Sequence, residues 1–67
     1  MVERIVARCH VGQSDRSVIN YVVSRLKDGR KTFFGLSRAR RKALLRRIIR
    51  AHRENQNLYR KVMSGRI

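Results

Sequence analysis

The sequence predicts a small all-α protein that ends in a long basic helix. Three observations predict this class. Apolar residues recur at helical spacing in three separate stretches of the 67-residue chain. The chain contains no proline, so no stretch carries the residue that most strongly breaks helices. At 42% hydrophobic residues, the chain has enough apolar side chains for one small core. We therefore expect a single domain over residues 1–67.

The first helix is predicted in the segment before Gly12. Its apolar residues follow the spacing i, i+3, i+4, i+7 of one helical face: Val2, Ile5, Val6 and Cys9. Ile5, Ala7, Cys9 and Val11 also lie at every second position, which fits a strand, and this alternative stays open. Gly12 is expected to end the element, because glycine can adopt positive φ.

The second helix is predicted to begin at Ser14, a good N-cap, with Asp15 at the positive helix end. Its apolar stripe consists of Val18, Ile19, Val22, Val23 and Leu26. Asp28-Gly29 is expected to stop this helix. The same dipeptide is a strong signal for a two-residue turn, so a short hairpin at residues 26–34 is an alternative for this region.

A third and longer helix is predicted from about residue 38 to 63, after a break at Gly35 and a cap at Ser37. Its apolar positions are spaced by three and four: Leu44, Ile48, Ala51, Leu58 and Val62, with Asn55 among them. The weak helix formers at 55–57 leave a second interpretation open, in which the helix splits and Asn57 caps a short last helix. We expect the long helix to close the core over the first two.

The charge balance indicates a polyanion as the partner. The chain has 18 Lys and Arg against 4 Asp and Glu, a formal charge of +14, and 14 of the bases are Arg. Residues 1–29 carry a net +2, whereas residues 30–67 carry thirteen bases against Glu54 alone. This composition argues against an acidic disordered tail and against an enzyme, since acids and histidines are too few for a catalytic set. It also offers no ligand set for a metal, and we expect no cofactor.

Residues 12–26 carry a recognisable pattern of turn, cap and helix. The pattern consists of Gly12, Ser14, Asp15, Arg16, Ser17, Val18, Asn20, Tyr21 and Val22. It resembles the turn and recognition helix of helix-turn-helix DNA-binding domains of the LuxR-type and sigma-factor region-four class. Two residues depart from that class, because Gln13 replaces an apolar residue and Arg8 replaces a small one. The resemblance implies that the helix over residues 13–27 reads the DNA major groove.

The polar side of this helix holds the predicted base-reading residues. They are Gln13, Asp15, Arg16, Ser17 and Asn20. Arginine can pair bidentately with guanine and asparagine with adenine, each worth roughly 1–3 kcal/mol of discrimination. We expect Asp15 to orient Arg16 or to accept from cytosine, and Gln13 to reach a base or a phosphate. A capped amphipathic helix with a merely solvated polar side is the simpler alternative.

The long helix carries like charges at repeated i, i+4 spacing. Arg38, Lys42, Arg46 and Arg50 form three such pairs, each unfavourable by roughly 0.2–0.5 kcal/mol. A phosphate backbone along this face would remove the repulsion and release counterions. The candidate phosphate contacts are Arg25, Lys27, Arg30, Lys31, Arg38, Arg41, Lys42 and Arg46.

These observations predict a small DNA-binding protein, acting as a transcriptional regulator or an architectural protein of a compact genome such as a phage or plasmid. An RNA- or ribosome-binding protein acting through the arginine-rich helix is the second interpretation, and a small inhibitor of a protein partner is the third. A homodimer is expected, because the core is small and paired half-sites multiply affinity. A single cysteine and the absence of a long apolar run favour the cytoplasm and no membrane partner.

Overall fold

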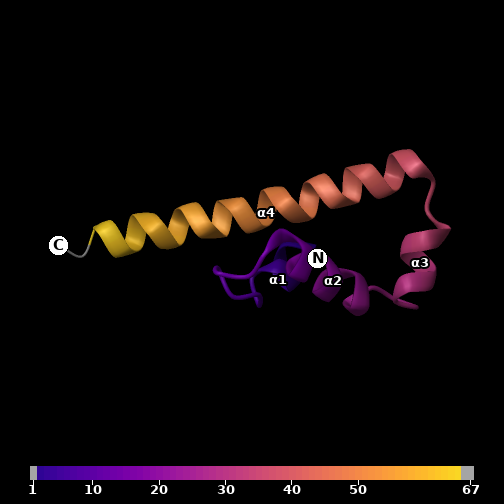
Figure 1. Ribbon diagram of the computed structural model, residues 1–67, viewed down its shortest axis with the longest axis horizontal. Helices are drawn as coiled ribbons and strands as arrows, with labels where there is room; N and C mark the ends of the chain where they lie inside the picture. The colour runs from indigo at the N-terminus through magenta and orange to yellow at the C-terminus, as the bar shows by residue number, and fades with distance from the viewer. Residues whose placement is uncertain (1, 66–67) are drawn as a thin grey trace.

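The computed structural model describes residues 2–65, and this part of the chain forms four helices and no strand. The helices are α1 (Val2–Val6), α2 (Asp15–Arg25), α3 (Arg30–Gly35) and α4 (Arg38–Ser64). Helix α4 runs along the longest axis, α1 and α2 pack beneath its middle, and α3 joins α2 to its N-terminal end (Figure 1). The all-α prediction is confirmed, and α4 closes the core as expected.

The N-terminal segment is a helix and not a strand. Regular α-helix ends at Val6, but helical hydrogen bonding continues beyond it, because the Cys9 amide donates to the Val6 carbonyl at 2.9 Å. A turn follows in which the Gln13 amide donates to the His10 carbonyl at 3.0 Å. Gly12 lies within this turn without using positive φ. The N-terminal segment therefore consists of a short helix and a tight turn that leads into α2.

Helix α2 begins as the sequence predicts. The Ser14 hydroxyl accepts a hydrogen bond from the Ser17 amide at 3.2 Å, which satisfies one of the free donors at the helix end. Val18 and Val22 are fully buried one turn apart and fix the inner face of the helix. The helix ends at Arg25, where the Leu26 amide donates to the Val23 carbonyl at 3.2 Å.

The hairpin alternative at residues 26–34 is wrong, because both segments that flank the turn are helical. Asp28 and Gly29 do adopt positive φ, at 64° and 56°. However, Gly29 has a ψ of −128°, far from the values near 0–30° of a type I′ turn, so the chain does not fold back on itself. It enters α3 instead, and the Thr32 hydroxyl donates to the Lys27 carbonyl across the corner.

Helix α4 is continuous from Arg38 to Ser64, so the predicted single helix is confirmed and the split at 55–57 is wrong. Its N-terminus is capped by Ser37, whose hydroxyl accepts from the Arg40 amide at 3.3 Å. Gln56 does not interrupt the helix, because its side chain faces the body of the protein and donates to the Val11 carbonyl at 2.8 Å. A tertiary contact thus supports the weakest stretch of the helix.

The core is small and lies where α1, α2 and α4 meet. Its buried members come from all three helices: Val2, Val6, Val18, Val22, Ile48 and Ala51. Ile5, Cys9, Ile19 and Leu44 pack around them. A core of this size supports only a marginally stable domain.

An exposed ion pair fastens α1 to α4. The Nε and Nη2 atoms of Arg47 donate to the two carboxylate oxygens of Glu3, each at 2.8 Å. The hydrogen bonds from Arg47 hold the pKa of the Glu3 carboxyl below its ordinary value of 4.5. A carboxyl with a lowered pKa in the folded state stabilises the fold above its unfolded pKa, and loses this contribution as the pH falls through the folded value.

We therefore expect Glu3→Gln to lower the thermal unfolding midpoint at pH 7 and to have a much smaller effect at pH 2. The measurement is the unfolding midpoint of wild type and variant, followed by circular dichroism at both pH values. The effect is modest, because both side chains face solvent. An equal difference between the two proteins at both pH values would contradict a role for the Glu3 charge.

Candidate nucleic-acid interface

Helix α2 turns its polar side to solvent. Arg16, Ser17 and Asn20 are exposed, whereas Val18 and Val22 on the other side are buried in the core. Because the apolar side is fixed against α1 and α4, the polar side must point outward. Three of the five predicted base-reading residues therefore lie on one accessible face.

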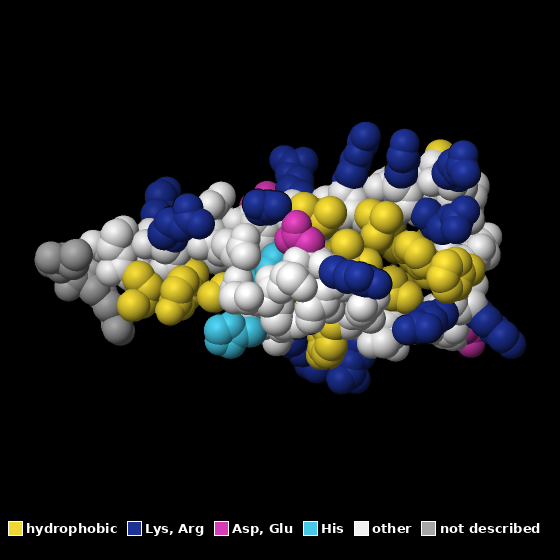
Figure 2. Space-filling view, in the orientation of Figure 1, with side chains coloured by type: hydrophobic (Ala, Val, Ile, Leu, Met, Phe, Trp, Pro, Cys, Tyr) yellow, Lys and Arg dark blue, Asp and Glu magenta, His cyan; other side chains and the backbone are white. Residues whose placement is uncertain are grey.

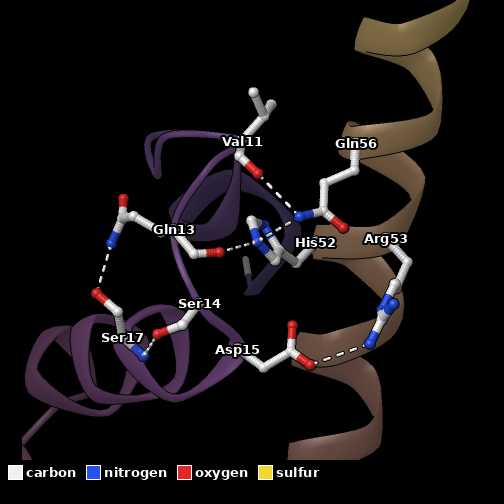
Figure 3. Close-up of polar contacts among 8 residues, drawn as sticks. All are labelled: Val11, Gln13, Ser14, Asp15, Ser17, His52, Arg53 and Gln56. Carbon is white, nitrogen blue, oxygen red and sulfur yellow. Dashed lines mark hydrogen bonds and ion pairs between the residues drawn. The ribbon is translucent and has the colours of Figure 1, made fainter.

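A partly buried polar cluster sets the position of the turn before α2, and we call it the turn clamp (Figure 3). It joins two carbonyl groups of the turn, those of Val11 and Gln13, to two side chains of α4, those of His52 and Gln56. His52 is only 1% exposed, and its Nε2 lies 2.9 Å from the Gln13 carbonyl oxygen. Since a carbonyl can only accept, Nε2 carries the hydrogen of this bond. The clamp holds the N-terminus of α2 against the middle of α4.

The Gln13 side chain is also used within the turn. Its Oε1 accepts from the His10 amide at 2.7 Å, and its Nε2 donates to the Ser17 hydroxyl at 2.8 Å. The sequence predicts that Gln13 reaches a base or a phosphate, but here both ends of its amide are occupied. Ser17 keeps its own hydroxyl hydrogen for a further acceptor.

Asp15 pairs with α4 rather than with its neighbour. Its carboxylate accepts from Arg53 at 3.1 Å, so it links the first turn of α2 to the long helix. The sequence predicts that Asp15 orients Arg16 or accepts from cytosine. In the structure its charge is instead compensated by Arg53, and Arg16 has no ion-pair partner among the described residues.

Three of the four acidic side chains of the protein form ion pairs with arginines of α4. Glu3 pairs with Arg47, Asp15 with Arg53, and Glu54 with Arg50 at 3.5 Å. Arg66 lies outside the described residues, and the other fourteen bases have no ion pair within residues 2–65. All eight predicted phosphate contacts belong to these fourteen: Arg25, Lys27, Arg30, Lys31, Arg38, Arg41, Lys42 and Arg46.

The N-terminal half of α4 is the most strongly basic surface. Arg38, Lys42 and Arg46 are exposed at i, i+4 spacing. Arg41 is half-buried beside Phe33, at an open hollow where α3 meets α4. Figure 2 shows Lys and Arg side chains along the outer edge of α4 and again below it, separated by a strip of hydrophobic side chains. Both groups of basic side chains are therefore accessible from the side of the molecule shown in Figure 2.

A second basic group lies at the junction of α2 and α3. Lys27, Arg30 and Lys31 are exposed there. Arg25 lies over the ring of Tyr21 at 5.1 Å from its centroid, a cation–π contact that restrains the guanidinium while leaving it accessible. Helix α3 lies between this junction and the N-terminal end of α4 (Figure 1).

Sequence reasoning left several exposed bases out of the predicted set. Arg4 and Arg8 near α1 and Arg40 in α4 are exposed and have no ion pair within the described residues. It also missed His52 and Gln56 as parts of the turn clamp. Their spacing offered a signal, since both continue the i, i+4 series that starts at buried Ile48.

Comparisons with protein-family models, with curated proteins and with solved structures find no match. Residues 2–65 contain no group of three His, Cys, Asp or Glu side chains placed to hold a metal ion. Among the described helices, none combines the length and the apolar character needed to cross a membrane. The interface must therefore be interpreted from its own chemistry.

Proposed function

We propose that the protein binds duplex DNA, with α2 in the major groove and the N-terminal half of α4 along the phosphates. One observation carries this proposal. Within residues 2–65, every acid except Asp28 is paired with an arginine of α4, while fourteen bases have no ion pair. The fold thus neutralises its own acids and leaves the rest of the basic surface for an external polyanion.

The spacing of these bases favours a phosphate backbone over a merely solvated face. Arg38, Lys42 and Arg46 repel one another along α4, since no acid lies between them. Each phosphate contact would remove part of this repulsion and release about 0.9 of a condensed counterion from B-DNA. Arginine also matches phosphate geometry through its planar, bidentate fork.

The local geometry around α2 supports a helix-turn-helix reading mode. A short helix, a four-residue turn at 10–13 and a capped helix follow one another, and α4 packs across both helices. A recognition helix contacts base edges from its N-terminal part. In α2 this part exposes Arg16, Ser17 and Asn20, the side chains best suited to major-groove readout. Occupying DNA in this way suits a transcriptional regulator or an architectural protein.

Arg16 and Asn20 should determine sequence preference without determining most of the affinity. For a duplex selected from a random pool, we expect Arg16→Ala or Asn20→Ala to reduce the preference over a scrambled duplex by about 1–3 kcal/mol, roughly 5- to 150-fold. For Asn20→Ala, the slope of log affinity against log salt should stay nearly unchanged. Fluorescence anisotropy with both duplexes measures these quantities.

Asn57→Ala provides a matched control, because Asn57 is an exposed asparagine of α4 outside the proposed interface. It should behave like the wild type on both duplexes. If both α2 variants kept the full sequence preference of the wild type, α2 would not be the reading helix. Competition by structured RNA, with no competition by duplex DNA, would instead favour RNA binding through α4.

A further inference from the structure

The C-terminal end of α4 projects beyond the body of the protein, and we call residues 55–64 the α4 overhang (Figure 1). Within residues 2–65, five large hydrophobic side chains are exposed, and four of them lie on this overhang. They are Leu58 at 62%, Tyr59 at 52%, Val62 at 55% and Met63 at 47% exposed. Figure 2 shows hydrophobic side chains gathered along one side of this projecting end. Clustered apolar exposure of this kind marks an interaction surface.

The exposed side chains continue a pattern that is buried elsewhere in the same helix. Ile48, Ala51, Asn55, Leu58 and Val62 follow alternating spacings of three and four, the heptad pattern of paired helices. The first two of these residues are covered by α1 and α2. Leu58 and Val62 occupy equivalent positions in the pattern but stay more than half exposed within the described residues. The apolar stripe is therefore half-covered by the chain's own helices.

We propose that a second copy of this chain covers the overhang, with the two α4 overhangs packed side by side and antiparallel. Charge complementarity identifies the occupant and its direction. Glu54 and Lys61 are seven residues apart, so both flank the apolar stripe on the same side. In an antiparallel pair, Glu54 of each copy faces Lys61 of the other. The existing contact between Glu54 and Arg50 is exposed and long, at 3.5 Å, and leaves the carboxylate accessible.

A parallel pair is disfavoured by the basic half of the same helix. It would bring Arg38, Lys42 and Arg46 of both copies to the same end of the assembly, where they repel one another. The antiparallel arrangement places these residues at opposite ends. Asn55, a half-buried polar residue within the stripe, would favour one register by requiring a polar partner.

The surface also has room for the partner's side chains. Where the overhang leaves the body, one hollow lies between Val11 and the side chains of Tyr59 and Met63. Another lies between Cys9 and the side chains of Leu58 and Val62. An apolar residue from the second copy can enter either hollow and be desolvated on several sides. Such pockets are where interfaces concentrate their binding energy.

The arrangement has a consequence that rests on the proposed DNA binding. With the twofold axis midway between Glu54 and Lys61, the two Ile48 residues, which mark the centres of the two cores, are about 30 Å apart along the helices, at 1.5 Å per residue. This is close to the roughly 34 Å that separates half-sites one DNA turn apart. The separation of the two cores along the helices thus matches the separation of two adjacent major grooves on one side of a duplex.

The test is sedimentation equilibrium over a concentration series, with protein that has been freed of nucleic acid by nuclease and high salt and then returned to moderate salt, where exposed ion pairs are not fully screened. We expect wild type to approach twice its 7.9 kDa chain mass. Leu58→Ser with Val62→Ser should raise the dimer dissociation constant by at least about tenfold. Phe34→Ser is the matched control, because Phe34 is 65% exposed on α3, away from the overhang, and it should leave the dimer intact. Circular dichroism checks that each variant stays helical.

Charge exchange tests the direction of pairing. Glu54→Lys should weaken the dimer, and adding Lys61→Glu to it should restore the dimer, because the swapped pair is again complementary. A wild-type chain that stays monomeric at every concentration, or a dimer that survives both serine substitutions, would overturn the proposal. Because the test contains no DNA, a failure to dimerise would not contradict the proposed DNA binding. Conversely, a dimer that does not bind DNA would contradict the proposed function and leave the proposed dimer intact.

Discussion

Replacing Arg38, Lys42 and Arg46 together by glutamine is expected to cause the largest loss of DNA affinity of any change considered for this protein. If each base contacts one phosphate, the slope of log affinity against log salt should become shallower by about three. The loss should be nearly equal for every duplex sequence, since phosphates carry no sequence information. Anisotropy titrations at several salt concentrations measure both quantities.

The same variant should fold at least as well as the wild type. All three side chains are exposed, and their removal relieves like-charge pairs worth about 0.2–0.5 kcal/mol each. In a control with the same loss of charge, glutamine replaces Arg4, Arg8 and Arg60, which lie outside the basic half of α4. If the control lost as much affinity as the α4 variant, net charge alone would explain binding, and the proposed phosphate row would be wrong.

His52→Ala is expected to have the largest effect on stability, about 2–4 kcal/mol. The substitution empties a fully buried site and leaves the Gln13 carbonyl without its hydrogen bond from Nε2. A chain of 67 residues has only about 3–10 kcal/mol of total stability at the usual value per residue, so the substitution should remove a large share of it. Urea unfolding followed by circular dichroism gives the free energy.

His10→Ala is the natural comparison, because the chain has just these two histidines. His10 is exposed, and its Nδ1 accepts a single local hydrogen bond from the Gly12 amide at 3.1 Å. Its loss should cost no more than about 1 kcal/mol. Equal and small losses for both variants would show that the turn clamp does not hold α2 in place.

The helices could be predicted because their signals are local. Ser14 and Ser37 cap the helices that they were expected to cap, and the spacing of buried Val18 and Val22 identified the inner face of α2. The hairpin prediction failed because positive φ at two successive residues does not by itself reverse the chain. Asp28 and Gly29 supply positive φ, and this conformation serves a helix-to-helix corner as well as a strand reversal.

The details of the candidate site depend on contacts that are distant in sequence. Arg53 reaches Asp15 across 38 residues, and Gln56 reaches the Val11 carbonyl across 45. Composition alone indicates how many bases exceed the acids, but it cannot show which arginines the acids neutralise. The structure assigns Arg47 to such a pair, and this assignment separates structural bases from the proposed phosphate contacts.

The most direct test of DNA binding is a competition at low ionic strength. A labelled duplex is bound to the protein, and unlabelled duplex or an RNA hairpin with the same number of phosphates is added in separate titrations. If the protein binds duplex DNA, the unlabelled duplex should displace the label at lower concentration than the hairpin, and added salt should weaken binding steeply. Displacement by the hairpin alone, or failure of the labelled duplex to bind at any salt concentration, would contradict it.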